Sequence, residues 1–376
     1  MKIPFNQPFL TGKETEYIEK AVKSGQLSGN GRFTKKCQSF FENKYNFKKT
    51  LLTTSCTDAL EMCSLLINIQ PGDEVIVPSY TFVSSALAFI RQGAKIVFAD
   101  SSSDNPNIDV SKIESLISSR TKAIVVVHYA GVAVDMDIVM SLAEKYSLFV
   151  IEDAAQAIDS YYKGKPLGGI GHLGTFSFHE TKNVISGEGG MLIINDEKLI
   201  DRAEIIWEKG TNRTSFFRGE IDKYGWVDLG SSFLPSEVIA AFLYAQIENL
   251  DVIQNTRKKI WNRYYDGLKG VSDKVKLPFI PSYATNNAHM FYLVTNSETE
   301  RNELISYLKE KGIHSVFHYL SLHKSTYYTS LYKEQNELLY SDLYTDRLLR
   351  IPFFYNLKEE EINYIISSLN SFYKLK

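Results

Sequence analysis

The segment Phe176–Asn183, with the sequence FSFHETKN, is followed closely by the glycine-rich stretch SGEGG at 186–190 and by the apolar stretch MLIIN at 191–195. This order predicts two buried strands joined by a bend, and the bend carries Lys182. An amine held between buried strands is partly desolvated, so its neutral, nucleophilic form becomes accessible and can condense with an aldehyde. A lysine in a turn is more commonly a solvated surface group, so this interpretation depends on the rest of the chain.

The overall composition limits the classes of protein to consider. The chain has 376 residues, of which 44% are hydrophobic, and a formal net charge of −2. This length favours two domains with a large core, and the small charge gives no reason to expect nucleic acid or an acidic membrane surface as a partner. Cys37, Cys56 and Cys63 are an odd set without metal-type spacing, which favours a reducing compartment. Since no stretch reads as a signal peptide or membrane span, we expect a cytoplasmic protein.

Apolar strands and amphipathic helices alternate through the first half of the chain. We expect helices at 13–24, 33–45, 81–92, 113–118 and 135–146, and strands at 51–53, 74–78, 94–99, 123–128 and 148–152. A loop, 28–31, separates the first two helices, and residues 55–58 cap a further helix. Continuous apolar strands separated by helices predict an α/β fold with a mainly parallel sheet covered on both faces.

The pattern changes after residue 195. Helices are expected at 197–209, 236–249, 252–268, 298–311 and 359–373, strands at 291–294 and 315–318, and a long ordered loop at 210–232. The last of these elements suggest a smaller α+β region. We therefore predict a large domain over 1–250 and a small C-terminal domain over 251–376, with the N-terminal segment packed on the small one.

Four polar residues fall at or just beyond strand ends: Ser55, Ser79, His128 and Asp153. Ligands of parallel sheets bind at the carboxyl ends of the strands, so we expect these groups to converge on one edge. A carboxylate such as Asp153 at the end of a buried strand requires a cation or strong donors. Opposite a pyridine nitrogen it would keep that nitrogen protonated, although it is equally suited to capping the next turn.

Residues 55–57, Ser-Cys-Thr, begin a helix and offer free N–H groups and hydroxyls, which suit a phosphate. The alternative is an ordinary helix cap. Ser177 can add another hydroxyl. Phe82, at a helix start, is placed either to stack on a flat heterocycle or to pack in the core, and His128 is equally explained as a hydrogen-bonded residue at a strand end.

Taken together, these features resemble the sugar aminotransferases, a family of fold type I pyridoxal-phosphate enzymes that act on nucleotide-linked keto sugars. The likeness covers almost the whole chain and is carried by SCTDAL at 55–60, PGDEV at 71–75, PSYTF at 78–82, EDAAQ at 152–156 and the segment 177–190. It implies a mainly parallel sheet of the seven-stranded type, a small C-terminal α+β domain, and a homodimer with its active sites at the interface.

Within that family the chain is most similar to the bacterial transaminases that make dTDP-4-amino-4,6-dideoxygalactose. The matching stretches are IPFN at 3–6, FHETKN at 178–183, EKGTNR at 208–213, NAHMFY at 287–292 and FHY at 317–319. This likeness implies L-glutamate as amino donor, dTDP-4-dehydro-6-deoxyglucose as acceptor, and a role in surface polysaccharides such as lipopolysaccharide O-antigen or enterobacterial common antigen.

The resemblance also implies roles for individual residues. Lys182 is expected to carry pyridoxal phosphate covalently and later to move the proton, while Asp153 pairs with the pyridine nitrogen and Gln156 lies beside the ring oxygen. Phe82 is expected to stack on the ring. The phosphate is assigned to Ser55, Cys56, Thr57 and Ser177. The sugar or its diphosphate is assigned to His179, His289, His318 and Tyr319, with His323 nearby, although a structural role fits each histidine equally well.

Two positions depart from the family pattern. The cradle commonly has glycine where Cys56 stands, so here the backbone must approach the phosphate beside a side chain. Many members also send an asparagine from the partner subunit to the phosphate, and the equivalent stretch, GSSFL at 230–234, has Ser232 at that place. We therefore include Ser232 among the expected cofactor-binding residues.

Three other classes of protein are considered. Related sugar dehydratases carry a histidine where Lys182 stands, and a non-catalytic relative that only binds the cofactor would be expected to lose Lys182 or Asp153. A nicotinamide dehydrogenase requires a Gly-x-Gly-x-x-Gly turn after the first strand, which residues 53–57 do not contain. The stereochemistry of the amine, galacto or its gluco epimer, stays open, with galacto favoured by the resemblance.

Overall fold

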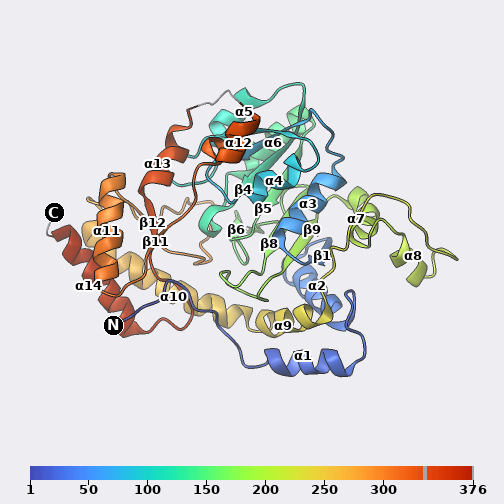
Figure 1. Ribbon diagram of the computed structural model, residues 1–376, viewed down its shortest axis with the longest axis horizontal. Coiled ribbons are helices and arrows are strands. Elements are labelled where there is room, and N and C mark those ends of the chain that lie inside the picture. The colour runs from blue at the N-terminus through green and yellow to red at the C-terminus, as the bar shows by residue number, and fades with distance from the viewer. Residues whose placement is uncertain (333–336, 375–376) are drawn as a thin grey trace.

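The computed structural model describes residues 1–332 and 337–374. Its centre is a seven-stranded sheet in the order β1-β9-β8-β5-β4-β2-β3 (Figure 1). The strands are β1 (Lys49–Thr53), β2 (Glu74–Pro78), β3 (Lys95–Ala99), β4 (Thr121–Val127), β5 (Phe149–Asp153), β8 (Leu173–Ser177) and β9 (Gly190–Ile194). Only β9 runs against its neighbours, while the pairs that link β3, β2, β4, β5 and β8 are parallel. The predicted mainly parallel sheet is confirmed.

Alternate side chains of each central strand enter opposite cores. In β4, Ile124 and Val126 join the core on one face and Ala123 and Val125 the core on the other, and all four are fully buried. A strand buried on both faces reads as a continuous apolar run, which explains the pattern in the sequence. The first core is completed by α2 (Arg32–Tyr45), α6 (Met136–Tyr146) and α9 (Glu237–Ile247), and the second by α3 (Cys56–Leu66), α4 (Ser84–Ile90) and α7 (Ile200–Trp207).

A smaller antiparallel sheet, in the order β10-β12-β11, lies beside the large one. Its strands are β10 (Tyr292–Val294), β11 (Val316–Phe317) and β12 (Leu348–Arg350), and α10 (Leu250–Leu268), α11 (Glu298–Glu310) and α14 (Glu359–Lys374) surround its core. The N-terminus reaches this region, because the N–H of Ile3 donates to the carbonyl of Gly312 at 2.8 Å (Figure 1). The domain division at residue 250 stays a prediction, since α10 places Ile253 in a core of the large sheet and Ile260 in the small one.

Several elements differ from the sequence-based expectation. The helix expected at 197–209 is a 3-10 turn, η3 (Glu197–Leu199), followed by α7, and the loop at 210–232 contains α8 (Arg213–Phe217). Short elements without a hydrophobic period were missed, namely α12 (Thr326–Leu331), α13 (Leu339–Arg347), β12 and the hairpin of β6 (Tyr161–Tyr162) and β7 (Lys165–Pro166). The remaining elements are α1 (Glu14–Lys23), α5 (Ile113–Leu116), η1 (Val110–Lys112), η2 (Tyr129–Gly131), η4 (Lys269–Val271) and η5 (Leu322–Lys324).

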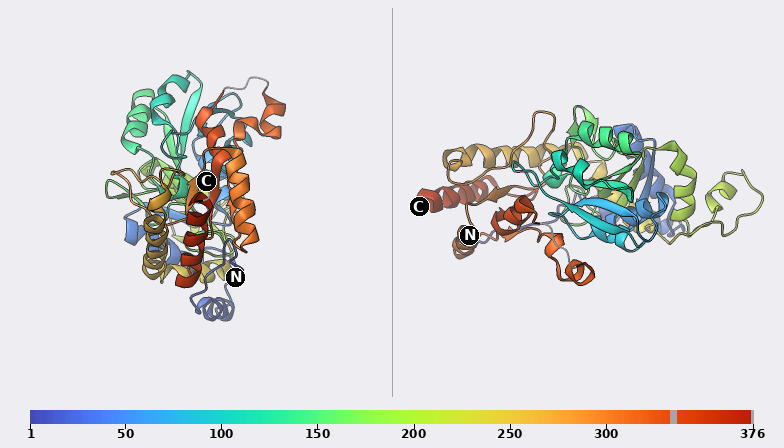
Figure 2. Two further views of the ribbon diagram at one scale, coloured as in Figure 1. Left: turned by 90° about the vertical axis from the view of Figure 1, so that its left-hand side faces the viewer. Right: turned by 90° about the horizontal axis from the view of Figure 1, so that it is seen from above.

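The arm that carries α8 lies at one end of the molecule (Figure 1). Figure 2 shows the arm that carries α8 projecting from the large sheet at the end opposite the C-terminal helices. Among the described residues, no helix combines the length and the apolar character needed to cross a membrane.

Candidate active site

A cavity of about 650 Å³ lies where the carboxyl ends of the central strands meet the small domain. Of the site residues predicted from the sequence, it brings together Ser55, Cys56, Thr57, Phe82, Asp153, Gln156, Ser177, His179, Lys182, His289, His318 and Tyr319. Segments more than two hundred residues apart in the chain therefore contribute side chains to one site.

Lys182 lies in the turn that follows β8, where its backbone N–H donates to the carbonyl of His179 at 2.9 Å. Its side chain is partly buried in the cavity wall. Burial lowers the pKa of the Lys182 amine from 10.5, against a smaller opposing effect of the nearby Cys56 and Asp153. The neutral, nucleophilic amine is therefore more accessible here than on an exposed lysine.

Asp153 is the last residue of β5 and is 6% exposed. One carboxylate oxygen accepts a hydrogen bond from Ser85 Oγ at 2.6 Å, and the other accepts from the Ala155 N–H at 3.2 Å. No lysine, arginine or histidine of the described chain is at ion-pair distance from this carboxylate. A buried carboxylate on a cavity wall without a cationic partner suits a protonated ring nitrogen.

The start of α3 provides both a helix cap and an anion site. Ser55 is the N-cap, and its hydroxyl accepts from the N–H of Asp58 at 3.1 Å, while its carbonyl accepts from Ala59. The first four N–H groups of a helix lack intrahelical partners, so those of Cys56 and Thr57 are left to face an anion. The helix cap and the phosphate site, the two interpretations of residues 55–57, are therefore compatible.

The cradle at the start of α3 depends on a close approach by β9. A Cβ added to Gly190 would lie 2.3 Å from the carbonyl carbon of Ser55 and 2.4 Å from the nitrogen of Cys56, so any larger residue would displace the backbone. The Cys56 thiol lies 3.5 Å from Thr175 Oγ1 on β8, and the Thr57 hydroxyl is 2.7 Å from Ser84 Oγ. Packing between strand and helix thus holds the cradle in place.

Aromatic side chains form the opposite wall. Phe82 is 56% exposed, so the core-packing interpretation is wrong, and its ring centroid lies 6.2 Å from that of Tyr319. The Tyr319 hydroxyl accepts from Gln156 Nε2 at 2.9 Å, and its ring stacks on that of His318 with centroids 3.5 Å apart. Gln156 Oε1 in turn accepts from the Ala130 N–H at 2.6 Å. Phe82, Tyr319 and His318 thus offer flat ring faces and a hydroxyl group to the cavity.

Two histidines of the small domain are held neutral. His289 Nδ1 is 2.8 Å from Asn183 Oδ1, and His318 Nδ1 is 2.6 Å from the Tyr129 hydroxyl. Burial holds the pKa of His289 and of His318 well below 6.5. His179 is more exposed and its Nδ1 lies 3.0 Å from Thr181 Oγ1.

The expectation that four strand-end groups converge on the site is wrong for Ser79 and His128, and His323 is also absent from the cavity lining. Ser79 Oγ lies 2.7 Å from His323 Nδ1, and both residues are buried. His128 Nε2 lies 2.9 Å from Glu152 Oε2, and neither side chain is exposed. Ser79 and His128 each have a polar partner in the protein interior, as the alternative interpretation of His128 predicted.

Ser232 does not line the cavity that contains Lys182 in the same chain. It is exposed and lines a separate cavity of about 560 Å³ together with Lys209 and Arg213. This location leaves the predicted contact with a partner subunit's phosphate as a prediction.

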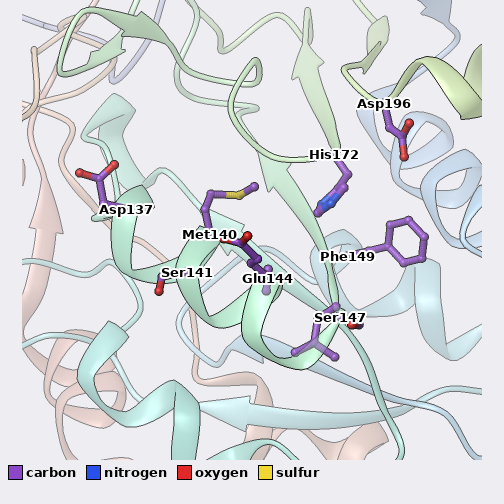
Figure 3. Close-up of a pocket in the computed structure, with 10 residues that line it drawn as sticks. Asp137, Met140, Ser141, Glu144, Ser147, Phe149, His172 and Asp196 are labelled. Carbon is purple, nitrogen blue, oxygen red and sulfur yellow. The ribbon is translucent and has the colours of Figure 1, made fainter.

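Another cavity, of about 690 Å³, lies between α6 and the start of β5 (Figure 3). Figure 3 shows His172 close to Phe149, with ring centroids 5.4 Å apart. His172 Nδ1 accepts from the backbone N–H of Val150 at 2.9 Å, and burial lowers its pKa. Although this cavity is larger, it contains none of the predicted site residues, so the cavity around Lys182 remains the candidate active site.

Arg350, the last residue of β12, lines the cavity and was missed in the sequence analysis. Its guanidinium lies 4.7 Å from the centroid of the Phe5 ring. No local signal marks it, because a three-residue strand after a helix of low amphipathicity has no readable period.

The arrangement defines a class of enzyme. An amine with a lowered pKa suits the aldehyde of pyridoxal phosphate, the buried carboxylate of Asp153 suits its ring nitrogen, and the free N–H groups of α3 suit its phosphate. On a mainly parallel seven-stranded sheet, these features are those of a fold type I pyridoxal-phosphate enzyme.

The chain belongs to the DegT/DnrJ/EryC1/StrS aminotransferase family, which matches residues 8–370. It is 33% identical to the GDP-perosamine synthase of Escherichia coli O157:H7, covering 100% of this chain and 99% of that protein. It is 30% identical to the spore coat polysaccharide biosynthesis protein SpsC of Bacillus subtilis, covering 99% and 97%. Among solved structures, the putative sugar aminotransferase Spr1654 of Streptococcus pneumoniae in its PMP form is 26% identical with a TM-score of 0.92, covering 100% of both chains. The protein is a pyridoxal-phosphate-dependent sugar aminotransferase.

Proposed function

We propose that the enzyme transfers the amino group of L-glutamate to C4 of dTDP-4-dehydro-6-deoxy-D-glucose, giving dTDP-4-amino-4,6-dideoxy-D-galactose for a surface polysaccharide. The single observation that supports this most strongly is the meeting of Lys182 and Asp153 in one cavity with the start of α3 and an aromatic wall, in a chain of the sugar aminotransferase family. The choice of sugar nucleotide follows from the subgroup likeness of the sequence.

The residues of this chain have distinct tasks in that reaction. The N–H groups of Cys56 and Thr57 would hold the phosphate of pyridoxal phosphate, and the Asp153 carboxylate would keep its ring nitrogen protonated. When bound, the cofactor supplies an electron-poor ring that accepts the electrons of a broken C–H bond. The Lys182 amine removes the proton from Cα of the amino donor and, in the second half of the reaction, delivers a proton to C4 of the sugar.

Apart from Arg350, the small domain faces the sugar with neutral groups. His289 and His318 are uncharged because burial lowers their pKa, and the Tyr319 hydroxyl is fixed by Gln156. Neutral donors and acceptors suit the hydroxyl groups of a hexose, whereas buried charges would have to be compensated. Phe82, exposed at the mouth of the cavity, is placed to cover the cofactor ring.

A second candidate is a GDP-linked keto sugar. Two relatives at 33% and 31% identity, from Escherichia coli O157:H7 and Caulobacter vibrioides, are GDP-perosamine synthases. A gluco rather than galacto product is the other alternative, because the face of the sugar that Lys182 protonates depends on how the ligand lies.

The substrate is tested by incubating the holoenzyme with L-glutamate and, in parallel, with the dTDP-linked and the GDP-linked 4-keto-6-deoxy sugars. NMR couplings of the C4 proton then report whether the amine is axial or equatorial. We expect turnover of the dTDP sugar to an axial amine. Faster turnover of the GDP sugar would contradict the proposed sugar nucleotide. An equatorial amine would contradict the proposed stereochemistry.

The role of Lys182 is tested separately. We expect Lys182→Ala to lose the visible absorbance of lysine-bound cofactor and to lower kcat by about 10³-fold or more, since the residue both anchors the cofactor and moves the proton. Lys163→Ala is the control, because Lys163 is exposed on the surface and pairs with Asp137. Retained turnover in Lys182→Ala would contradict the proposed role of Lys182 in proton transfer.

A further inference from the structure

Arg350 occupies a rigid place on the cavity wall. It ends β12, the middle strand of the small sheet, and is paired in register with Tyr292 of β10 on one side and Val316 of β11 on the other. Its side chain is partly buried and lines the same cavity as Lys182. A side chain on the central strand of a sheet is better fixed than one on a loop, so its direction is built into the fold.

The charge of Arg350 has no partner within the described chain. No carboxylate of residues 1–332 or 337–374 is at ion-pair distance from its guanidinium, and its buried Nε–H has no acceptor. Its neighbours are instead aromatic: the Phe5 ring lies beneath the guanidinium, and Tyr80, Tyr129 and Tyr319 are near enough to oppose the lowering of its pKa by burial. A largely desolvated cation without an anion is costly, which indicates that the cavity receives one.

The anion must lie near the reacting atoms. Arg350 and Lys182 line the same cavity. The positive charge of Arg350 also contributes, less than burial does, to lowering the pKa of Lys182, of His289 and of His318. In an α-amino acid the carboxylate is attached to the same carbon as the transferred amine. In a nucleotide sugar the phosphates are attached at C1, across the ring from the reacting C4. A cation in the cavity that contains Lys182 therefore suits the carboxylate of an amino donor better than the diphosphate of the sugar.

We propose that Arg350 binds the α-carboxylate of the amino donor, an inference that rests on the proposed aminotransferase function. The planar guanidinium presents parallel N–H groups that match the two oxygens of a carboxylate, which a lysine cannot reproduce. The same cavity then admits the sugar in the other half of the reaction, with Arg350 facing hydroxyl groups. Arg350 thus selects the donor, and the neutral histidines and Tyr319 receive the acceptor.

Ligand binding without turnover provides the first test. Calorimetry on the pyridoxal-phosphate holoenzyme measures the affinity for glutarate, a dicarboxylate without an amine, and for dTDP. We expect Arg350→Gln to weaken glutarate binding by roughly 10- to 100-fold, the span expected for hydrogen bonds to a charged group, and to leave dTDP binding unchanged. Arg350→Lys should recover only part of the loss. Arg347→Gln, on the preceding helix and outside the cavity lining, is the matched control and should bind both like the wild type.

Single-turnover measurements provide the second test. Arg350→Gln should slow the reaction of glutamate with the pyridoxal-phosphate form while sparing the reaction of the keto sugar with the pyridoxamine-phosphate form. Weakened dTDP binding with unchanged glutarate binding, or equal slowing of both half-reactions, would overturn the assignment and leave the aminotransferase function intact. If the wild-type enzyme does not react with glutamate, glutamate is not the amino donor, and the proposed function is wrong on that point. Should Arg350→Gln fail to fold, judged by circular dichroism, Arg350→Lys gives the same comparison.

Discussion

Lys182 has a side chain whose charged form is disfavoured by its surroundings. Burial is the main cause of its lowered pKa, and the nearby charge of Arg350 adds to it. Asp153 opposes this effect only in part. The site therefore contains three groups without a partner of opposite charge in ion-pair contact among the described residues. These are the Lys182 amine, which loses its proton easily, the Asp153 carboxylate and the Arg350 guanidinium.

The lowered pKa of Lys182 has a predictable effect on the stability of the apoenzyme. Below the folded-state pKa the buried ammonium costs free energy, and because the unfolded chain holds more protons between that pKa and 10.5, stability rises with pH through this window. We expect Lys182→Met to stabilise the apoenzyme near neutral pH and to lose this advantage near pH 10.5. Denaturant unfolding of both proteins at the two pH values measures the difference.

Lys163→Met is the control for this pH experiment, because Lys163 forms an exposed ion pair with Asp137 that raises the pKa of its amine. Its removal should give no stabilisation near neutral pH. A pH-independent effect of Lys182→Met would mean that the amine is not desolvated.

At the scale of secondary structure elements, the start of α3 combines stability and binding. Ser55 caps the helix, and Gly190 in β9 passes so close to the Ser55–Cys56 peptide that no larger residue fits there. The Ser55 side chain satisfies one of the otherwise unpaired N–H groups of the helix, and the cofactor phosphate would use others. We therefore expect one turn of helix to serve folding and cofactor binding together.

Two serine caps in this chain separate these contributions. At the start of α3, Ser55 Oγ accepts a hydrogen bond from the Asp58 N–H at 3.1 Å. At the start of α11, Ser297 Oγ accepts one from the Glu300 N–H, also at 3.1 Å. We expect Ser55→Ala and Ser297→Ala each to lower the free energy of unfolding of the apoenzyme by about 1 kcal/mol. Only Ser55→Ala should also weaken pyridoxal phosphate binding, measured by equilibrium titration of the cofactor absorbance. Equal cofactor affinity in both variants would show that Ser55 is a cap alone.

At the scale of the whole molecule, the α8 arm carries several exposed apolar side chains. Phe217, Trp226, Val227 and Leu229 are exposed by 67%, 82%, 55% and 59%, and Ser232 follows shortly after them in the chain. Clustered exposed apolar side chains of this kind favour contact with another chain. This supports the expectation of a homodimer in which Ser232 reaches the phosphate site of the partner subunit.

Mixed dimers test this arrangement. We expect Ser232→Trp, which fills the space around the phosphate, to be inactive alone, and Lys182→Ala to be inactive alone. If Ser232 acts across the interface, mixing the two variants after partial unfolding assembles one intact site per mixed dimer, and activity returns. If Ser232 acts within its own chain, no site is intact and activity stays absent. Ser231→Trp is the matched control, and light scattering measures the oligomeric state.

Much of this protein was determined by local sequence. The α/β class follows from apolar runs of strand length separated by helical periods, and the cofactor-side residues follow because each lies at or just past a strand end, where a parallel sheet must expose it. Lys182, Asp153 and Ser55 could be named in this way from the chain alone. The same rule failed for Ser79 and His128, which meet His323 and Glu152 in the interior.

Only the tertiary structure decided which polar groups face the cavity and which are satisfied elsewhere, because that depends on neighbours distant in the chain. Arg350 shows this most clearly: its strand is too short to have a period, and it lines the same cavity as Lys182 only because the small sheet packs beside the large one. Local patterns record whether a residue is buried or exposed along one element. The direction of a side chain toward a shared site is set by how the elements pack, which no single stretch encodes.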